Sequence, residues 1–135
     1  MTTAMGLRVG QELPPLKKTA LVRGSYAWGS PHNAEYATKV LGFRGALVPG
    51  VTTLAYVAEM LRRFFGPIWL ERGTIDVNFI GGGAVDGDTV VAHAVITALG
   101  DEDGKTRVEM DVWLEDEAVG GQKVLAGTAS CLLDR

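Results

Sequence analysis

Two hydrophobic periods follow each other along the chain, and the change between them marks the predicted elements. Between residues 51 and 65 apolar side chains recur every three or four positions, as on one buried face of a helix. Gly66-Pro67 ends this pattern, because proline lacks a backbone donor and cannot continue the helix. Beyond it the period falls to two, which is typical of strands with one buried face. These strand-like segments are 73–80, 89–99, 106–115 and 123–133.

The remaining segments connect these elements. Residues 17–22 fit a short first strand, and residues 100–104 and 119–121 fit hairpin connections because of their glycine and charge content. A long connection, rich in glycine and proline, runs from 24 to 50, and its one helical pattern covers 33–41. Connections of this length in a small domain usually carry functional residues, so we expect the site here.

This order of elements predicts an α+β fold in which an antiparallel five-stranded sheet wraps around one central helix at about 51–65. The 135 residues suit a single domain, 1–135. One helix cannot cover both faces of such a sheet. We therefore expect a second copy to cover or extend it, in a homodimer or a higher homo-oligomer.

Composition narrows the possible partners. The net charge of −3 leaves no basic surplus for phosphates, so no nucleic acid partner is expected. The N-terminus lacks the features of a signal peptide, and the longest apolar stretch, 90–99, is far short of the roughly 20 residues that span a bilayer. No membrane association is expected. The single cysteine, Cys131, fits a cytoplasmic location.

Several short segments, in this order, are similar to those of one enzyme family. They are Val9-Gly10-Gln11-Glu12-Leu13-Pro14-Pro15-Leu16, Pro31-His32-Asn33-Ala34-Glu35-Tyr36-Ala37, Gly42-Phe43-Arg44-Gly45-Ala46-Leu47-Val48-Pro49-Gly50, Val85-Asp86-Gly87-Asp88-Thr89-Val90 and Gly127-Thr128-Ala129. Together they resemble the MaoC-like hydratase/dehydratase family, which has a hotdog fold and acts on acyl thioesters. The resemblance covers nearly the whole chain.

The resemblance implies a catalytic histidine and an oxyanion-binding glycine. In the family an aspartate and a histidine five residues later activate water, and the backbone at the helix start binds the thioester carbonyl. Here the histidine is His32 and the glycine is Gly50, whereas Ala27 stands at the position of the aspartate. Glu35 is the carboxylate nearest to His32 in sequence, and helical spacing would place both on one side. We expect Glu35 to orient the imidazole in its place.

Other residues of the long connection are candidates for contact with the acyl group. Tyr26, Trp28 and Phe43 could line its pocket, although aromatic residues in such a loop more often anchor the loop itself. Asn33 and Val51, which follow His32 and Gly50, are further candidates. No metal and no separate cofactor are expected, because coenzyme A or an acyl carrier is part of the substrate.

Three functions remain open from the sequence. The first is reversible hydration of a trans-2-enoyl thioester by a cytoplasmic lyase of fatty acid metabolism. The second is a hotdog thioesterase in which Glu59 directs water at the carbonyl, although Glu59 can equally pair with Arg62 or Arg63 within one helical turn. The third is an inactive acyl-thioester-binding subunit, which the missing aspartate favours.

Overall fold

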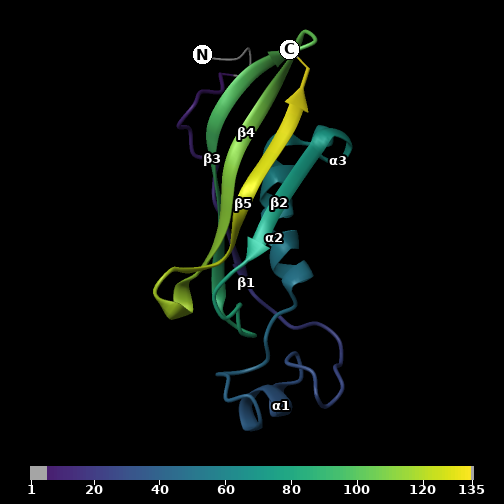
Figure 1. Cartoon of the computed structure of the whole chain (residues 1–135), viewed down its shortest axis with the longest axis vertical. Helices are drawn as coiled ribbons and strands as arrows, with labels where there is room; N and C mark the ends of the chain where they lie inside the picture. Colours follow the sequence, from purple (N-terminus) through teal and green to yellow (C-terminus); the bar gives the residue numbers. More distant parts are fainter. Residues whose placement is uncertain (1–5, 135) are drawn as a thin grey trace.

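The computed structural model describes residues 6–134 and confirms the predicted α+β architecture. Five antiparallel strands, in the order β1-β3-β4-β5-β2, curl around helix α2 (Figure 1). The elements are β1 (Leu16–Thr19), α1 (Ala34–Lys39), α2 (Gly50–Phe65), α3 (Ile68–Arg72), β2 (Gly73–Phe79), β3 (Thr89–Glu102), β4 (Lys105–Asp116), the 3-10 helix η1 (Glu117–Val119) and β5 (Gln122–Leu133).

Helix α2 buries one face against the concave side of the sheet. The predicted residues Val57, Leu61 and Phe65 are buried, together with Met60 and Thr53. Complete burial of an aliphatic side chain of this size contributes roughly 1.5–3 kcal/mol. Leu54 and Ala58, which the helical pattern also placed on this face, are only partly buried.

The first hairpin is tighter than the sequence predicted. Gly100 lies inside β3, and the turn consists of Asp103 and Gly104 between paired Glu102 and Lys105. Both turn residues have positive φ, 52° and 79°, as a two-residue type I′ turn requires. The strands are therefore longer than their hydrophobic alternation indicated.

A short helix, α3, follows Pro67 and joins α2 to β2. Its Trp69 is 7% exposed and stacks on Phe65 with ring centroids 6.2 Å apart. A Cβ on Gly73 would come within 2.3 Å of the Trp69 ring, so only glycine fits where β2 begins. The sequence prediction missed this helix, since five residues carry too little periodicity to distinguish it from a turn.

The long connection and α1 lie beyond the N-terminal end of α2 (Figure 1). Strand β2 runs alongside α2 and ends at Phe79, near the start of that helix. β2 pairs with β5 on one side only, which leaves its other edge free within the described chain. No helix among residues 6–134 is long and apolar enough to cross a membrane.

Candidate active site

Asn33 organises the part of the long connection that carries His32. Its Oδ1 accepts a hydrogen bond from the Tyr36 N–H at 2.9 Å and thereby caps α1. Its Nδ2 donates to the Tyr26 carbonyl, also at 2.9 Å. Both ends of the amide are thus engaged by the loop backbone, and Asn33 holds the loop rather than offering a free group to a substrate.

His32 is fixed by a contact across the loop. Its Nδ1 lies 2.6 Å from the Leu47 carbonyl oxygen, and the Leu47 N–H donates to the Pro31 carbonyl at 2.9 Å. Because a carbonyl only accepts, Nδ1 must carry the proton. In the neutral ring Nε2 then holds the lone pair, and no described residue occupies Nε2 with a hydrogen bond. His32 therefore presents a basic nitrogen.

Helix α2 begins without a side-chain cap. Pro49 is its N-cap residue, and no acidic side chain stands in the first turn. None of the residues 6–134 accepts a hydrogen bond from the N–H of Gly50 or Val51. These donors and the helix dipole favour negative charge at this point. A Cβ on Gly50 would lie only 3.0 Å from the Phe79 ring, so glycine lets β2 approach the helix start closely.

His32 and Gly50 line one pocket of about 320 Å³, which we name the helix-start pocket. The other residues that line it are Leu47, Val48, Thr53, Phe79, Ile80, Gly81, Gly82, Gly83, Ala84 and Val124. Of these residues only His32 can ionise. An acyl group here would meet apolar walls, one imidazole and the free N–H groups of α2, a combination suited to chemistry at a thioester carbonyl.

Glu35 does not lie in this pocket. Its carboxylate is 73% exposed and lies 3.9 Å from the Lys39 ammonium on the same helix. The expected pairing with His32 assumed helical spacing, but α1 begins only at Ala34, so His32 precedes the helix. The Leu47 carbonyl, rather than Glu35, orients the imidazole.

Two of the three aromatic candidates make ring contacts within the long connection. The Tyr26 ring lies 4.9 Å from that of His32, tilted by 60°, and Trp28 meets Tyr36 edge to face at 5.1 Å. Trp28 is 62% exposed, and neither Trp28 nor Phe43 lines the helix-start pocket. Val51 is 75% exposed on the first turn of α2, beside the pocket rather than within its lining.

Sequence reasoning did not identify one wall of the pocket. Phe79, Ile80 and the triple glycine 81–83 come from the end of β2 and the loop that follows. The triple glycine was the available signal, because a run of glycines lets the backbone approach a neighbour closely. Its position next to the helix start follows from the pairing of β2 with β5, which local patterns do not reveal.

Glu59 of helix α2 takes part in an ion-pair network. One carboxylate oxygen accepts from Lys18 Nζ at 3.1 Å, and the other lies 2.7 Å from Arg63 Nη2. The hydrogen bond from Lys18 holds the pKa of Glu59 below its usual range. The carboxylate thus remains charged and paired, and Glu59 does not line the helix-start pocket.

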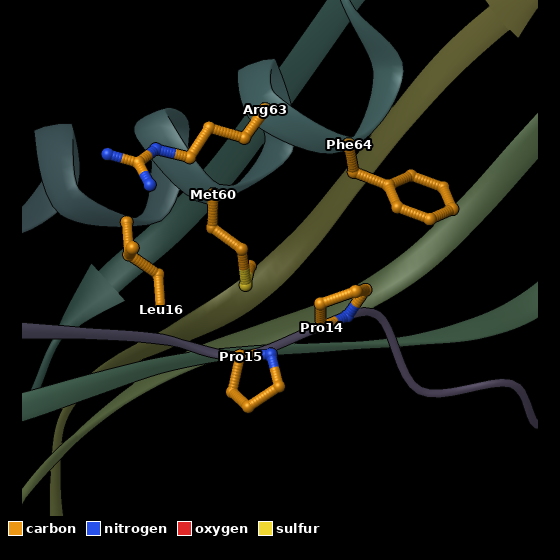
Figure 2. Close-up of a pocket in the computed structure, with 6 residues that line it drawn as sticks. All are labelled: Pro14, Pro15, Leu16, Met60, Arg63 and Phe64. Atoms are coloured by element: carbon orange, nitrogen blue, oxygen red, sulfur yellow. The ribbon is translucent and has the colours of Figure 1, made fainter.

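A second pocket of about 300 Å³ lies along α2, between that helix and the segment entering β1. Figure 2 shows Met60 extending from α2 toward Pro14 and Pro15, and Phe64 from the same helix also lines this pocket. Its charged residue, Arg63, is bound to Glu59. This apolar pocket offers enclosure but no group that transfers protons near neutral pH. Among residues 6–134 no cluster of three or more His, Cys, Asp or Glu could hold a metal.

No protein-family model matches the sequence, and no curated protein matches it significantly. Solved structures do match. The unliganded (R)-hydratase PhaJ1 from Pseudomonas aeruginosa aligns with a TM-score of 0.73 and 18% identity, over 97% of this chain and 84% of that chain. A MaoC-like dehydratase from Rhodospirillum rubrum gives 0.69 and 14%, over 98% and 96% of the two chains.

A thioesterase shares the same arrangement more distantly. The fluoroacetyl-CoA thioesterase FlK aligns with a TM-score of 0.54 and 16% identity, over 95% of this chain and 89% of that chain. At these identities the likeness concerns the fold. The chain has the hotdog fold of the (R)-hydratases and MaoC-like dehydratases.

Proposed function

We propose that the protein adds water to a trans-2-enoyl thioester, and removes it again in the reverse direction, in the helix-start pocket. One observation carries the proposal: the pocket brings the basic nitrogen of His32 together with the uncapped start of α2 at Gly50. A general base and an oxyanion site are the two groups that this reaction requires.

A single histidine can both accept and return the proton that moves in this reaction. His32 Nε2 takes a proton from water while the water oxygen forms a bond to C3 of the enoyl group. The π electrons move toward the thioester carbonyl oxygen, where the Gly50 N–H at the start of α2 stabilises the enolate. The imidazolium then returns its proton to C2. One hydroxyl group and one hydrogen have been added, and the histidine is neutral again.

The Leu47 carbonyl takes over an orienting role in this scheme. It accepts the Nδ1–H hydrogen bond at 2.6 Å, so it holds the ring in one tautomer and stabilises the imidazolium when it forms. The aspartate position of the resembled family is occupied by exposed Ala27. A neutral carbonyl stabilises a cation less than a carboxylate does, so we expect turnover to be slow.

The carrier of the acyl group is coenzyme A or a carrier protein, and it enters as part of the substrate.

We also propose a homodimer formed through the free edge of β2. Phe79, the last residue of this strand, is 55% exposed, and Val51 on α2 and Leu70 on α3 are 75% and 74% exposed. An unpaired edge beside apolar side chains favours pairing with a second copy. The molar mass in solution, measured by light scattering, checks this: 14.4 kDa would exclude it.

A panel of trans-2-enoyl-CoA substrates of different chain lengths tests the function. Loss of the enoyl-thioester absorbance without release of free thiol supports hydration. Release of thiol would instead establish a thioesterase. Ligand binding to the folded protein, with neither signal for any chain length, would establish an inactive acyl-binding subunit.

A further inference from the structure

A pair of buried carboxyl groups lies near the loop that orients His32. Asp88, just before β3, is 6% exposed, and Asp116, the last residue of β4, is fully buried at 0%. They are the two buried carboxyl groups within residues 6–134. Neither lines the helix-start pocket. A buried pair of like charges is costly, so the way in which this pair is satisfied needs a physical explanation.

Asp88 is surrounded by donors. Arg44 binds it with both terminal nitrogens, Nη1 to Oδ1 at 3.2 Å and Nη2 to Oδ2 at 2.9 Å, and the Val85 N–H donates to Oδ2 at 3.0 Å. Burial alone would raise its pKa, but the bonds from Arg44, Asp116 and Val85 lower the pKa of Asp88 to about 2. Asp88 is therefore an ionised acceptor.

Asp116 lacks an equivalent set of donors. Its Oδ1 accepts from the Ala118 N–H at 3.0 Å and caps η1. Its Oδ2 is buried and has no donor among the described residues. Asp116 is the cross-strand partner of Val90, two residues beyond Asp88, so the register of the strands brings the two buried carboxyls close to each other. Two carboxyls can bond only if one of them carries a proton, and Asp88 is the one stabilised as an anion.

We propose that Asp116 keeps a proton on Oδ2 and donates it to Asp88, and that this bond, continued through Arg44, positions the loop that orients His32. Arg44 stands three residues before Leu47, whose carbonyl contacts His32. The same loop is attached to the residues that precede Asp88. The Asp86 N–H donates to the Ala46 carbonyl, and the Val48 N–H donates to the Ala84 carbonyl, both at 2.8 Å. Loss of the shared proton loosens this attachment.

The charged surroundings decide the pH at which the proton leaves. Burial, and after it the neighbouring Asp88, raises the pKa of Asp116 to about 6. The hydrogen bond from the Ala118 N–H and the charge of Arg44 act in the opposite direction and lower it. The cross-strand neighbours of Asp116, Val90 on β3 and Gln122 on β5, carry no charge. Asp88 and Arg44 are thus the groups that set this titration. The attachment holds at pH 5 and weakens above pH 6.

Carboxyl ¹³C NMR of the wild-type protein between pH 4 and pH 8 tests the shared proton directly. One aspartate resonance should stay protonated at pH 5, lose its proton near pH 6 and be absent from Asp116→Asn. The exposed Asp111→Asn variant, on the same strand, should retain it. Titration of every carboxyl below pH 5 would overturn the proposal, and this outcome can be read from the wild type even if a variant does not fold.

Amide hydrogen exchange at Val48 tests the link to the loop. In Asp116→Asn the introduced side-chain amide can donate to Asp88 at every pH, so this variant mimics the protonated state. At pH 5 both proteins should exchange at the same rate. At pH 7.5 the Val48 amide of the wild type should exchange about tenfold faster than that of the variant. A factor of ten is the change in an equilibrium constant that corresponds to a difference of one pKa unit. If the ratio of the wild-type exchange rate to the variant exchange rate is the same at both pH values, the link to the loop is overturned.

The positioning role toward His32 rests on the proposed function, but neither measurement uses a substrate. Failure of the enoyl-thioester assay would therefore leave the shared proton and the loop attachment as they are. If turnover is present, the ratio of kcat for Asp116→Asn to kcat for wild type should rise above pH 6. A ratio independent of pH would overturn the positioning role alone.

Discussion

The Nδ1 atom of His32 lies 2.6 Å from the carbonyl oxygen of Leu47, fifteen residues further along the chain. This contact fixes which nitrogen of the ring is basic, and it connects the proposed proton-transfer group to the segment that leads into α2. The chemistry of the site thus depends on a main-chain atom rather than on an acidic side chain.

We predict that neutral His32 is the Nδ1–H tautomer. The Leu47 carbonyl can only accept, so it stabilises that form and leaves Nε2 with the lone pair. Long-range ¹H–¹⁵N correlation NMR of the neutral imidazole distinguishes the two tautomers. A proton found on Nε2 would remove the basic nitrogen that the hydration scheme requires.

Replacement of Gly50 by alanine should weaken substrate binding without unfolding the protein. The added methyl group meets the Phe79 ring at 3.0 Å, and this ring is 55% exposed and can shift outward. The methyl group then occupies space that the thioester carbonyl needs. We expect KM to rise about tenfold, which corresponds to about 1.4 kcal/mol.

Gly82→Ala is the matched control, since Gly82 lines the same pocket and a Cβ there meets nothing within 4 Å. Its KM should stay near the wild-type value. Equal effects of the two substitutions would contradict a specific role of the helix start.

Glu59→Gln should leave turnover unchanged. The carboxylate is paired with Lys18 and Arg63 outside the helix-start pocket, so its loss removes a partly exposed ion pair and no reacting group. The free energy of unfolding should fall by less than about 1 kcal/mol. Urea denaturation and the enoyl-CoA assay measure the two effects. If the wild type releases thiol and this variant does so much more slowly, Glu59 is the residue that activates water.

The succession of one strand, one central helix and four further strands along the chain followed from the sequence, because the hydrophobic period changes cleanly after Gly66-Pro67. The family resemblance implied that His32 and Gly50 belong to one site. The pocket that they share forms only when the chain is folded. Glu35 was wrongly expected beside His32, because Asn33 caps α1 and leaves His32 outside the helix.

The pair of buried carboxyls could not be predicted either. Asp88 binds Arg44, which lies 44 positions away from it in the sequence. Long-range pairs of this kind follow from strand pairing and loop closure, which local hydrophobic patterns do not encode. Asp116 lies just beyond the strand predicted at 106–115, and nothing in the local pattern indicates that it is buried.

The stability of the wild type should decrease between pH 5 and pH 7.5 relative to Asp116→Asn. Folding raises the pKa of Asp116 from 3.8 to about 6. Its contribution to the free energy of unfolding is therefore complete below pH 3.8 and is lost as the pH rises through 6. The loss over this interval should be about 1 kcal/mol. Asp88, whose pKa is lowered to about 2, acts in the opposite sense and only below its ordinary value of 3.8.

Urea denaturation of both proteins at the two pH values gives this difference, and titrations common to both proteins cancel in it. An identical change in the two proteins would show that Asp116 has an ordinary pKa in the folded state.

Hydration of trans-2-enoyl-CoA by wild type and His32→Ala, followed by the enoyl-thioester absorbance, tests the central claim most directly. His32 is the one ionisable residue among those that line the pocket. Loss of a general base costs about 10²- to 10⁴-fold in rate, so kcat of the variant should fall by at least the lower factor. Turnover by a folded His32→Ala protein at the wild-type rate would contradict the proposed function.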